Sequence, residues 1–184
     1  MRFDENNSVL VTLPEGVEIE ARADVIKVKG EKGELSRVFK APLVEISKEP
    51  VGVRFRVKKV TQREKKLVGT LVAHLKNMIK GVTQGITYKL KICSTHFPMN
   101  VQLKGNEFVV NNYLGEKFPR ILKLKHPEVK IEIAGDIITV SGVDKEKVAQ
   151  TAADIELLLR RTDYDKRIFQ DGIYIIEKDG KPVK

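Results

Sequence analysis

Residues 61–81 read TQREKKLVGTLVAHLKNMIKG, and this stretch decides the fold of the first half of the chain. Its apolar residues recur every three or four positions, which is the spacing of one face of an α-helix. Thr61 and Glu64 have the spacing of a capping box, and Gly81 marks the end. The stretch therefore predicts an amphipathic helix over about residues 62–80. Its apolar face comprises Val68, Leu71, Val72, Leu75, Met78 and Ile79.

Short segments with alternating apolar and polar residues precede this helix. A two-residue apolar period is typical of strands that have one buried face and one wet face. Residues 1–85 are therefore predicted to form a small α+β domain, in which antiparallel strands pack against one helix. The strand-like segments cover residues 9–13, 17–20, 25–29, 35–39, 43–46 and 53–57.

The same order of segments returns about 85 residues later. Strand-like segments lead to a second amphipathic stretch, predicted as a helix over about residues 144–161 with Asp144 as its cap. Val148, Thr151, Ala152, Ile155, Leu158 and Leu159 repeat the spacing of the first helix. Two copies of one unit indicate a duplication, since a solenoid needs three or more. We predict two tandem, duplicated α+β domains over residues 1–85 and 86–184.

The charge balance points to a polyanionic partner. Lys and Arg number 34 against 25 Asp and Glu, which leaves a net charge of +9. Nucleic acid is the leading partner class and an anionic membrane surface is the second. No membrane span is expected, because no apolar run approaches the roughly 18 residues that a span needs. The polar N-terminal residues do not resemble a secretory signal, so a cytoplasmic protein is expected.

The titratable residues form no pattern of catalytic or metal-binding chemistry. His74, His96 and His126 each lack a second His or Cys at ligand spacing, so we interpret them as solvated or hydrogen-bonded. Cys93 follows Ile92 and alternates with Lys91 in a strand-like segment, so it is interpreted as a small buried apolar residue. We expect no enzyme activity, no cofactor and no metal, because nucleophile, base and oxyanion donors are not found together.

Two further local patterns have ordinary structural explanations. Residues 30–33 (GEKG) match a loop that clamps RNA backbones, but strand-like segments on both sides favour a hairpin turn. Asp163 and Asp165 lie among arginines that would lower their pKa values, so surface ion pairs are expected.

Basic residues gather in three clusters, over residues 54–66, 117–130 and 160–169. Residues 1–85 hold 17 basic and 11 acidic residues, against 17 and 14 in residues 86–184, so net charge alone favours the first half. The third cluster is the best defined, because its arginines are mixed with Tyr164 and Phe169. With no Trp, four Tyr and seven Phe, the composition favours structured RNA read by shape and phosphate over a stacking platform.

Residues 166–175 (KRIFQDGIYI) resemble the C-terminal signature of the large-subunit ribosomal protein six family, in its archaeal and eukaryotic form. Residues 77–85 (NMIKGVTQG), 96–98 (HFP) and 114–117 (LGEK) follow the family's order. The resemblance implies a structural constituent of the large (50S) subunit in the cytoplasm. It also implies contact with 23S-type rRNA near the sarcin–ricin region and the base of the factor-binding stalk. Neighbouring ribosomal proteins and translation factors would lie nearby, and the glycine-rich bacterial ending is absent, which favours an archaeal source.

In the family, the C-terminal domain makes most of the RNA contacts. We carry this role to Lys117, Arg160, Arg161, Lys166, Arg167 and Phe169, and add Lys123 and Lys125 on charge alone. The cluster over residues 54–66 is interpreted as serving a neighbouring protein or solubility. Two other classes remain open from the residues themselves: a small RNA-processing enzyme and a protein-only adaptor that binds at a sheet edge.

Overall fold

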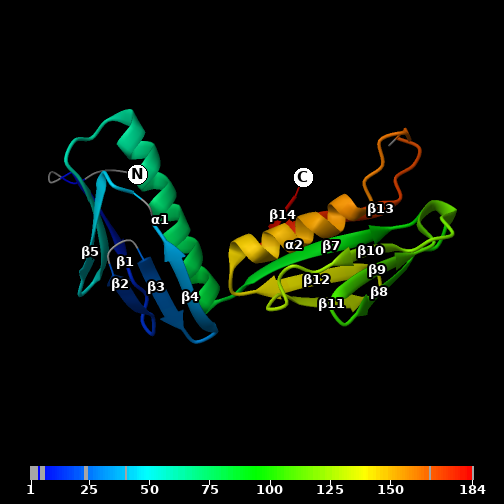
Figure 1. Cartoon of the computed structure of the whole chain (residues 1–184), viewed down its shortest axis with the longest axis horizontal. Coiled ribbons are helices and arrows are strands. Elements are labelled where there is room, and N and C mark those ends of the chain that lie inside the picture. The colour runs from blue at the N-terminus through cyan, green and yellow to red at the C-terminus, as the bar shows by residue number, and fades with distance from the viewer. Residues whose placement is uncertain (1–3, 5–6, 23–24, 40, 166, 184) are drawn as a thin grey trace. The chain divides into compact units, whose positions relative to one another are not determined.

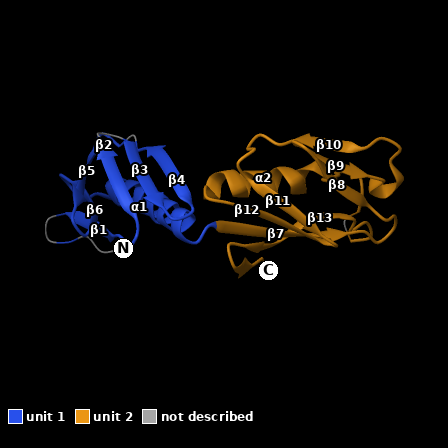
Figure 2. Ribbon diagram, turned by 90° about the horizontal axis from the view of Figure 1, so that it is seen from below, with its two compact units in different colours: residues 1–85 blue, residues 86–184 orange. Residues whose placement is uncertain are grey.

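A computed structural model describes residues 4, 7–22, 25–39, 41–165 and 167–183 (Figure 1). The chain forms two compact units, Met1–Gly85 and Ile86–Lys184, called unit 1 and unit 2 below (Figure 2). Within the described part, neither helix is long and apolar enough to cross a membrane.

Unit 1 holds two antiparallel three-stranded sheets and one helix. The strand orders are β1-β6-β5 and β2-β3-β4. The helix α1 packs against β3, β4 and β1. The elements are β1 (Ser8–Thr12), β2 (Glu18–Arg22), β3 (Val25–Gly30), β4 (Gly33–Val38), β5 (Val44–Glu49), β6 (Gly52–Val57) and α1 (Gln62–Thr83).

The helix α1 buries the predicted apolar face, with Val68 and Leu75 fully buried. Its start differs from the prediction. Thr61 occupies the N-cap position, but its side chain accepts no hydrogen bond from a backbone N–H. The hydroxyl of Thr61 donates to the Glu64 carboxylate instead, so the capping-box prediction was wrong. The Thr61 and Glu64 side chains bond to each other, so the Thr61 hydroxyl does not cap a backbone N–H group of the first turn.

Residues 30–33 form the predicted hairpin turn between β3 and β4, with Gly30 opposite Gly33. The turn packs on the end of α1, because the N–H of Lys32 donates to the carbonyl oxygen of Val82 at 2.9 Å. A Cβ atom on Gly30 would lie 2.8 Å from Cγ2 and 2.9 Å from the carbonyl oxygen of Val82. Glycine is therefore required at position 30 by the close approach of the hairpin to the helix.

Unit 2 repeats the plan of unit 1, which confirms the predicted duplicated α+β fold. The sheet β8-β9-β10 corresponds to β2-β3-β4, and β11-β12-β7 corresponds to β5-β6-β1. In both units a helix follows the last hairpin, which is β5-β6 in unit 1 and β11-β12 in unit 2. The Asp144 carboxylate caps α2 as predicted, because it accepts a hydrogen bond from the Glu146 N–H at 2.9 Å. The elements are β7 (Ile86–Cys93), β8 (Asn100–Lys104), β9 (Glu107–Asn111), the 3₁₀ turn η1 (Tyr113–Gly115), β10 (Arg120–Lys123), β11 (Lys130–Ala134), β12 (Ile137–Gly142), α2 (Lys145–Leu158), β13 (Gly172–Lys178) and β14 (Lys181–Pro182).

Two additions distinguish unit 2 from unit 1 in the described ranges. The strands β13 and β14 extend one sheet beyond β7, giving the order β11-β12-β7-β13-β14. The connection between β9 and β10 spans residues 112–119 and contains η1, where unit 1 has the short turn between β3 and β4. Both additions lie beside the predicted RNA-binding segment.

Cys93 is half-buried, not buried as predicted, because it is the last residue of β7.

Candidate nucleic-acid interface

Residues 159–171 join α2 to β13 and carry most of the predicted site. Ring contacts hold this segment in place. The ring of Phe169 stacks on His96 with centroids 4.9 Å apart, and Tyr164 meets Phe169 edge-on at 4.8 Å. The guanidinium group of Arg161 lies 4.3 Å above the Tyr164 ring. Aromatic and cation–π contacts of this kind restrict a loop without help from regular secondary structure.

Asp171 anchors the end of the same segment, and its side chain is only 1% exposed. The carboxylate accepts hydrogen bonds from the backbone N–H groups of Thr95 (2.7 Å) and His96 (3.0 Å). It also contacts the Thr95 hydroxyl at 2.9 Å and His96 Nδ1 at 2.6 Å. Burial alone would raise the pKa of Asp171, but these hydrogen bonds outweigh it and hold the pKa well below its usual range. The carboxylate is therefore ionised and ties β13 to the residues that follow β7.

A second polar network joins the 112–119 loop to the end of α2. Arg120 forms a fork with Glu116, through Nε at 2.8 Å and Nη2 at 2.7 Å, and Nη1 donates to the Leu158 carbonyl oxygen at 2.8 Å. The hydroxyl of Tyr113 donates to the Leu159 carbonyl oxygen at 2.7 Å. Both contacts satisfy carbonyl groups that a helix leaves free at its C-terminus. Hydrogen bonding from Arg120 lowers the pKa of Glu116, although its partial burial opposes this.

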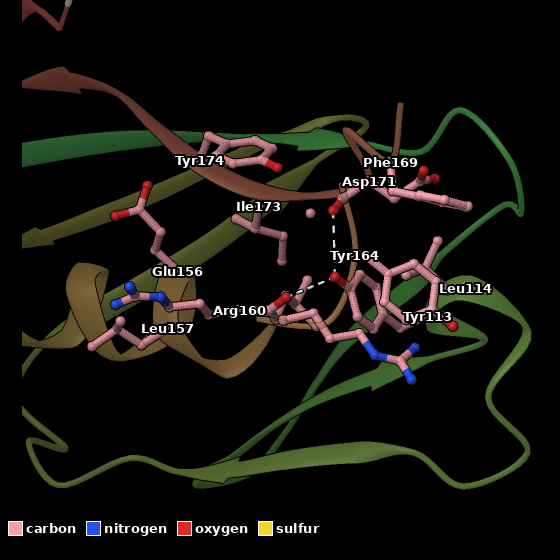
Figure 3. Close-up of a pocket in the computed structure, with 13 residues that line it drawn as sticks. Tyr113, Leu114, Glu156, Leu157, Arg160, Tyr164, Phe169, Asp171, Ile173 and Tyr174 are labelled. Carbon is pink, nitrogen blue, oxygen red and sulfur yellow. Dashed lines mark hydrogen bonds between the residues drawn. The ribbon is translucent and has the colours of Figure 1, made fainter. Parts of the chain in front are cut away.

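A cavity of about 290 Å³ opens between α2, the 159–171 segment and β13 (Figure 3). Leu159 and Ile173, which are buried, form apolar parts of its lining. Glu156 and Leu157 line it on the α2 side, and Arg160 also borders it (Figure 3). The aromatic lining residues are Tyr113, Tyr164, Phe169 and Tyr174.

The fold brings together the predicted contact residues of the 160–169 cluster and the 112–119 loop. Arg161 lies 3.5 Å from Glu116, so Lys117, the neighbour of Glu116, comes to the same end of unit 2. Lys117 and Arg160 are exposed. Arg167 is 90% exposed and forms a fork with Asp165, which has a lowered pKa, as expected for an ion pair there. This end of unit 2 therefore combines cationic side chains with an aromatic cavity.

Two of the remaining predicted contacts, Lys123 and Lys125, lie elsewhere, and Lys166 falls outside the described residues. Lys123 ends β10, and the Nζ atom of Lys125 lies 3.1 Å from the carboxylate of Asp154. Arg120 contacts the C-terminal end of α2, and from there the chain runs back along the helix. Both lysines therefore lie away from the cavity.

Residues 13–85 and 97–172 match the model of a family described as Ribosomal protein L6. The chain belongs to the ribosomal protein L6 family. The two matched segments cover one unit each, in agreement with the duplication. Membership confirms the predicted resemblance and the expectation of a structural, non-enzymatic protein.

Three archaeal relatives match the chain over most of its length. The large ribosomal subunit protein uL6 of Aeropyrum pernix is 45% identical over 172 residues, covering 92% of this chain and 93% of the relative. That of Ignicoccus hospitalis is 42% identical over 183 residues, covering 92% and 94%. That of Methanosarcina mazei is 43% identical over 168 residues, covering 91% and 95%.

Sequence reasoning missed three residues that build this end of the L6 fold. Tyr113, Arg120 and Asp171 are not in the predicted set, although Asp171 lies within the quoted signature and Arg120 within a basic cluster. Their partners are 46, 38 and 75 residues away. The sequence shows that Asp171 stands directly before a strand-like segment, but spacing alone does not reveal its burial or its partners.

Proposed function

We propose that this chain is a structural constituent of the large ribosomal subunit and that unit 2 is its main RNA-binding part. The relatives, which are large ribosomal subunit proteins, support the first statement. The observation that carries the second is the convergence of the 112–119 loop and the 159–171 segment through Arg161 and Glu116. Guanidinium groups suit phosphates, and exposed rings suit unpaired bases.

The two additions to unit 2, which are β13-β14 and the 112–119 loop, support unit 2 over unit 1 as the main RNA-binding part.

Unit 1 has more net positive charge, but Arg54 already binds groups of the protein itself. It forms a fork with Glu49 and donates to the Ser8 hydroxyl at 2.9 Å. Arg54, one residue of the cluster over residues 54–66, is therefore less available than its charge indicates, while Arg56 and Lys59 of the same cluster are exposed. Neighbouring ribosomal proteins are the proposed partners of its remaining charges.

Within unit 2 we assign the RNA contacts to two groups. Lys117, Arg160 and Arg167 contact phosphates, while Arg161 and Phe169 contact RNA and also order the segment. Lys166 belongs with them by its place in the sequence, and Lys123 and Lys125 form the margin of the footprint. The RNA is 23S-type rRNA near the sarcin–ricin region and the base of the factor-binding stalk, as the family resemblance implies, and the complex is cytoplasmic.

Sedimentation of a native cell lysate through sucrose at moderate and high salt tests this proposal. The protein is followed by mass spectrometry and the RNA by absorbance. We expect near-stoichiometric co-migration with large subunits, maintained in the moderate-salt gradient. Residence in the free-protein fractions at moderate salt would overturn the proposal and favour the enzyme or adaptor interpretation.

A further inference from the structure

We infer that the cavity between α2, the 159–171 segment and β13 receives one unpaired nucleobase of the bound RNA. This inference rests on the proposed function and adds a ligand to it. Phosphate contacts position a protein on RNA, whereas a base placed in a pocket distinguishes one nucleotide from its neighbours.

The first argument is the distribution of aromatic side chains. The chain has four tyrosines, and three of them, Tyr113, Tyr164 and Tyr174, line this cavity together with Phe169. Most of the tyrosines are thus gathered at one place, which composition alone could not show. Unpaired bases are held in RNA complexes by stacking on aromatic side chains.

The second argument is the apolar surface left uncovered around the cavity. Tyr164 is 37% exposed, Tyr174 42% and Leu157 53%. Grouped apolar exposure of this kind marks an interaction site, whereas scattered single residues do not. A flat aromatic base would cover rings and a leucine side chain at once.

The third argument is the way β13 shapes the wall. Gly172 and Tyr174 are two residues apart on one strand, so they share a face. A Cβ atom on Gly172 would lie 3.1 Å from both Cζ and the hydroxyl oxygen of Tyr174. The Tyr174 ring therefore lies back over the glycine along the strand. Glycine at this position leaves the space that the ring occupies beside the cavity.

Size and charge decide between a base and other occupants. A volume of about 290 Å³ lies just below the usual range of ligand pockets, roughly 300–1,000 Å³, so the cavity suits one base better than a larger ligand. Arg160 and Arg161 border the cavity, and the exposed Arg167 follows on the same segment. Cationic groups beside an aromatic pocket complement a nucleotide, which brings its own phosphate.

Base stacking and phosphate contact respond differently to salt, and this difference provides the test. The full chain is bound to purified large-subunit rRNA of its own source over a salt series. We expect Tyr174→Leu and Phe169→Leu each to weaken binding by about 5- to 150-fold at every salt concentration, with an unchanged log–log slope. Arg160→Gln should instead reduce the slope by about 0.7–0.9. Leu103→Ala, an exposed substitution on β8 outside the cavity, is the matched control.

Chemical probing of the RNA provides a second readout. A single unpaired base should be protected by the wild-type chain and become reactive with Tyr174→Leu, while the hydroxyl-radical footprint on the backbone stays the same. Thermal unfolding of each variant shows whether the fold is kept. With a folded Tyr174→Leu variant, loss of that one protection supports the base pocket.

The outcomes separate this inference from the proposed function. If the wild-type chain fails to bind the rRNA, the proposed function is wrong. If the wild-type chain binds and the Tyr174→Leu variant binds equally well, the base pocket alone is wrong, because Tyr174 is not among the RNA contacts of the proposed function. If the variants bind naked rRNA normally but fail to join subunits when other ribosomal proteins are present, the cavity holds a protein segment and the inference is overturned.

Discussion

The carboxylate of Asp171 lies 2.6 Å from Nδ1 of His96 and also accepts the backbone N–H of His96. The two residues flank paired strands, since His96 follows β7 and Asp171 precedes β13. One buried carboxylate thereby joins the ends of both strands. Phe169 stacks on the His96 ring, so the same contact supports the candidate RNA-binding segment.

Asp171→Asn should lower the free energy of unfolding at neutral pH by about 1–3 kcal/mol, because buried donors lose a charged acceptor. The folded-state pKa of Asp171 is depressed, so its ionised form stabilises the fold above the unfolded value of about 3.9. This contribution declines as the pH falls from there towards the folded-state pKa. Urea unfolding between pH 2 and pH 7 measures it.

The difference between wild type and Asp171→Asn should therefore narrow below about pH 4. Asp165→Asn removes another carboxylate with a lowered pKa, but an exposed one, and serves as the control with a smaller effect. A constant difference across this pH range would show that the Asp171 charge is not what stabilises the contact.

Arg120→Met should destabilise unit 2 by about 1–3 kcal/mol, because it leaves Glu116 and the Leu158 carbonyl oxygen without their donor. Arg120→Lys should restore only part of the loss, since one ammonium group cannot replace a guanidinium fork. Hydrogen exchange of the last turn of α2 reports the effect. Lys125→Met, which removes an exposed ion pair, should change stability by under about 0.5 kcal/mol. Equal effects from both residues would contradict the structural role of Arg120.

Gly30→Ala should destabilise unit 1 by about 1–3 kcal/mol, because the new methyl group would press on the backbone and side chain of Val82. Thermal unfolding of the full chain measures the loss. Glu31→Ala, at an exposed position of the same turn, should have little effect. Loss of stability in both variants alike would point to the turn itself and not to its contact with α1.

Replacing Arg160 and Arg167 together by Gln should weaken rRNA binding and reduce its log–log salt slope by about 0.7–0.9 for each lost phosphate contact. Filter binding over a salt series measures the slope. The matched pair is Arg56→Gln with Lys59→Gln in unit 1, where both side chains are exposed. A larger slope change from the unit 1 pair would assign the main RNA contact to unit 1.

Local patterns predicted the elements well, because their causes are local. Both amphipathic helices, the Asp144 cap and the hairpin at residues 30–33 depend on residues within a few positions of one another. The predicted capping box at Thr61 was wrong although its residues are only three positions apart. The Thr61 hydroxyl bonds to the Glu64 carboxylate and not to a backbone N–H. Spacing shows which groups can meet, and geometry decides which of them do.

The sequence by itself determined the α+β class, the duplication and membership of the L6 family. Helical and strand periods and repeated segments can be read directly from the order of the residues. Only the tertiary structure decided that Asp171 binds Thr95 and His96, that Arg54 donates to the Ser8 hydroxyl, and that three tyrosines surround one cavity. The first two contacts depend on the pairing of β7 with β13 and of β1 with β6. Strand pairing joins residues tens of positions apart, so the meeting of their side chains is set by the packed fold and not by local spacing.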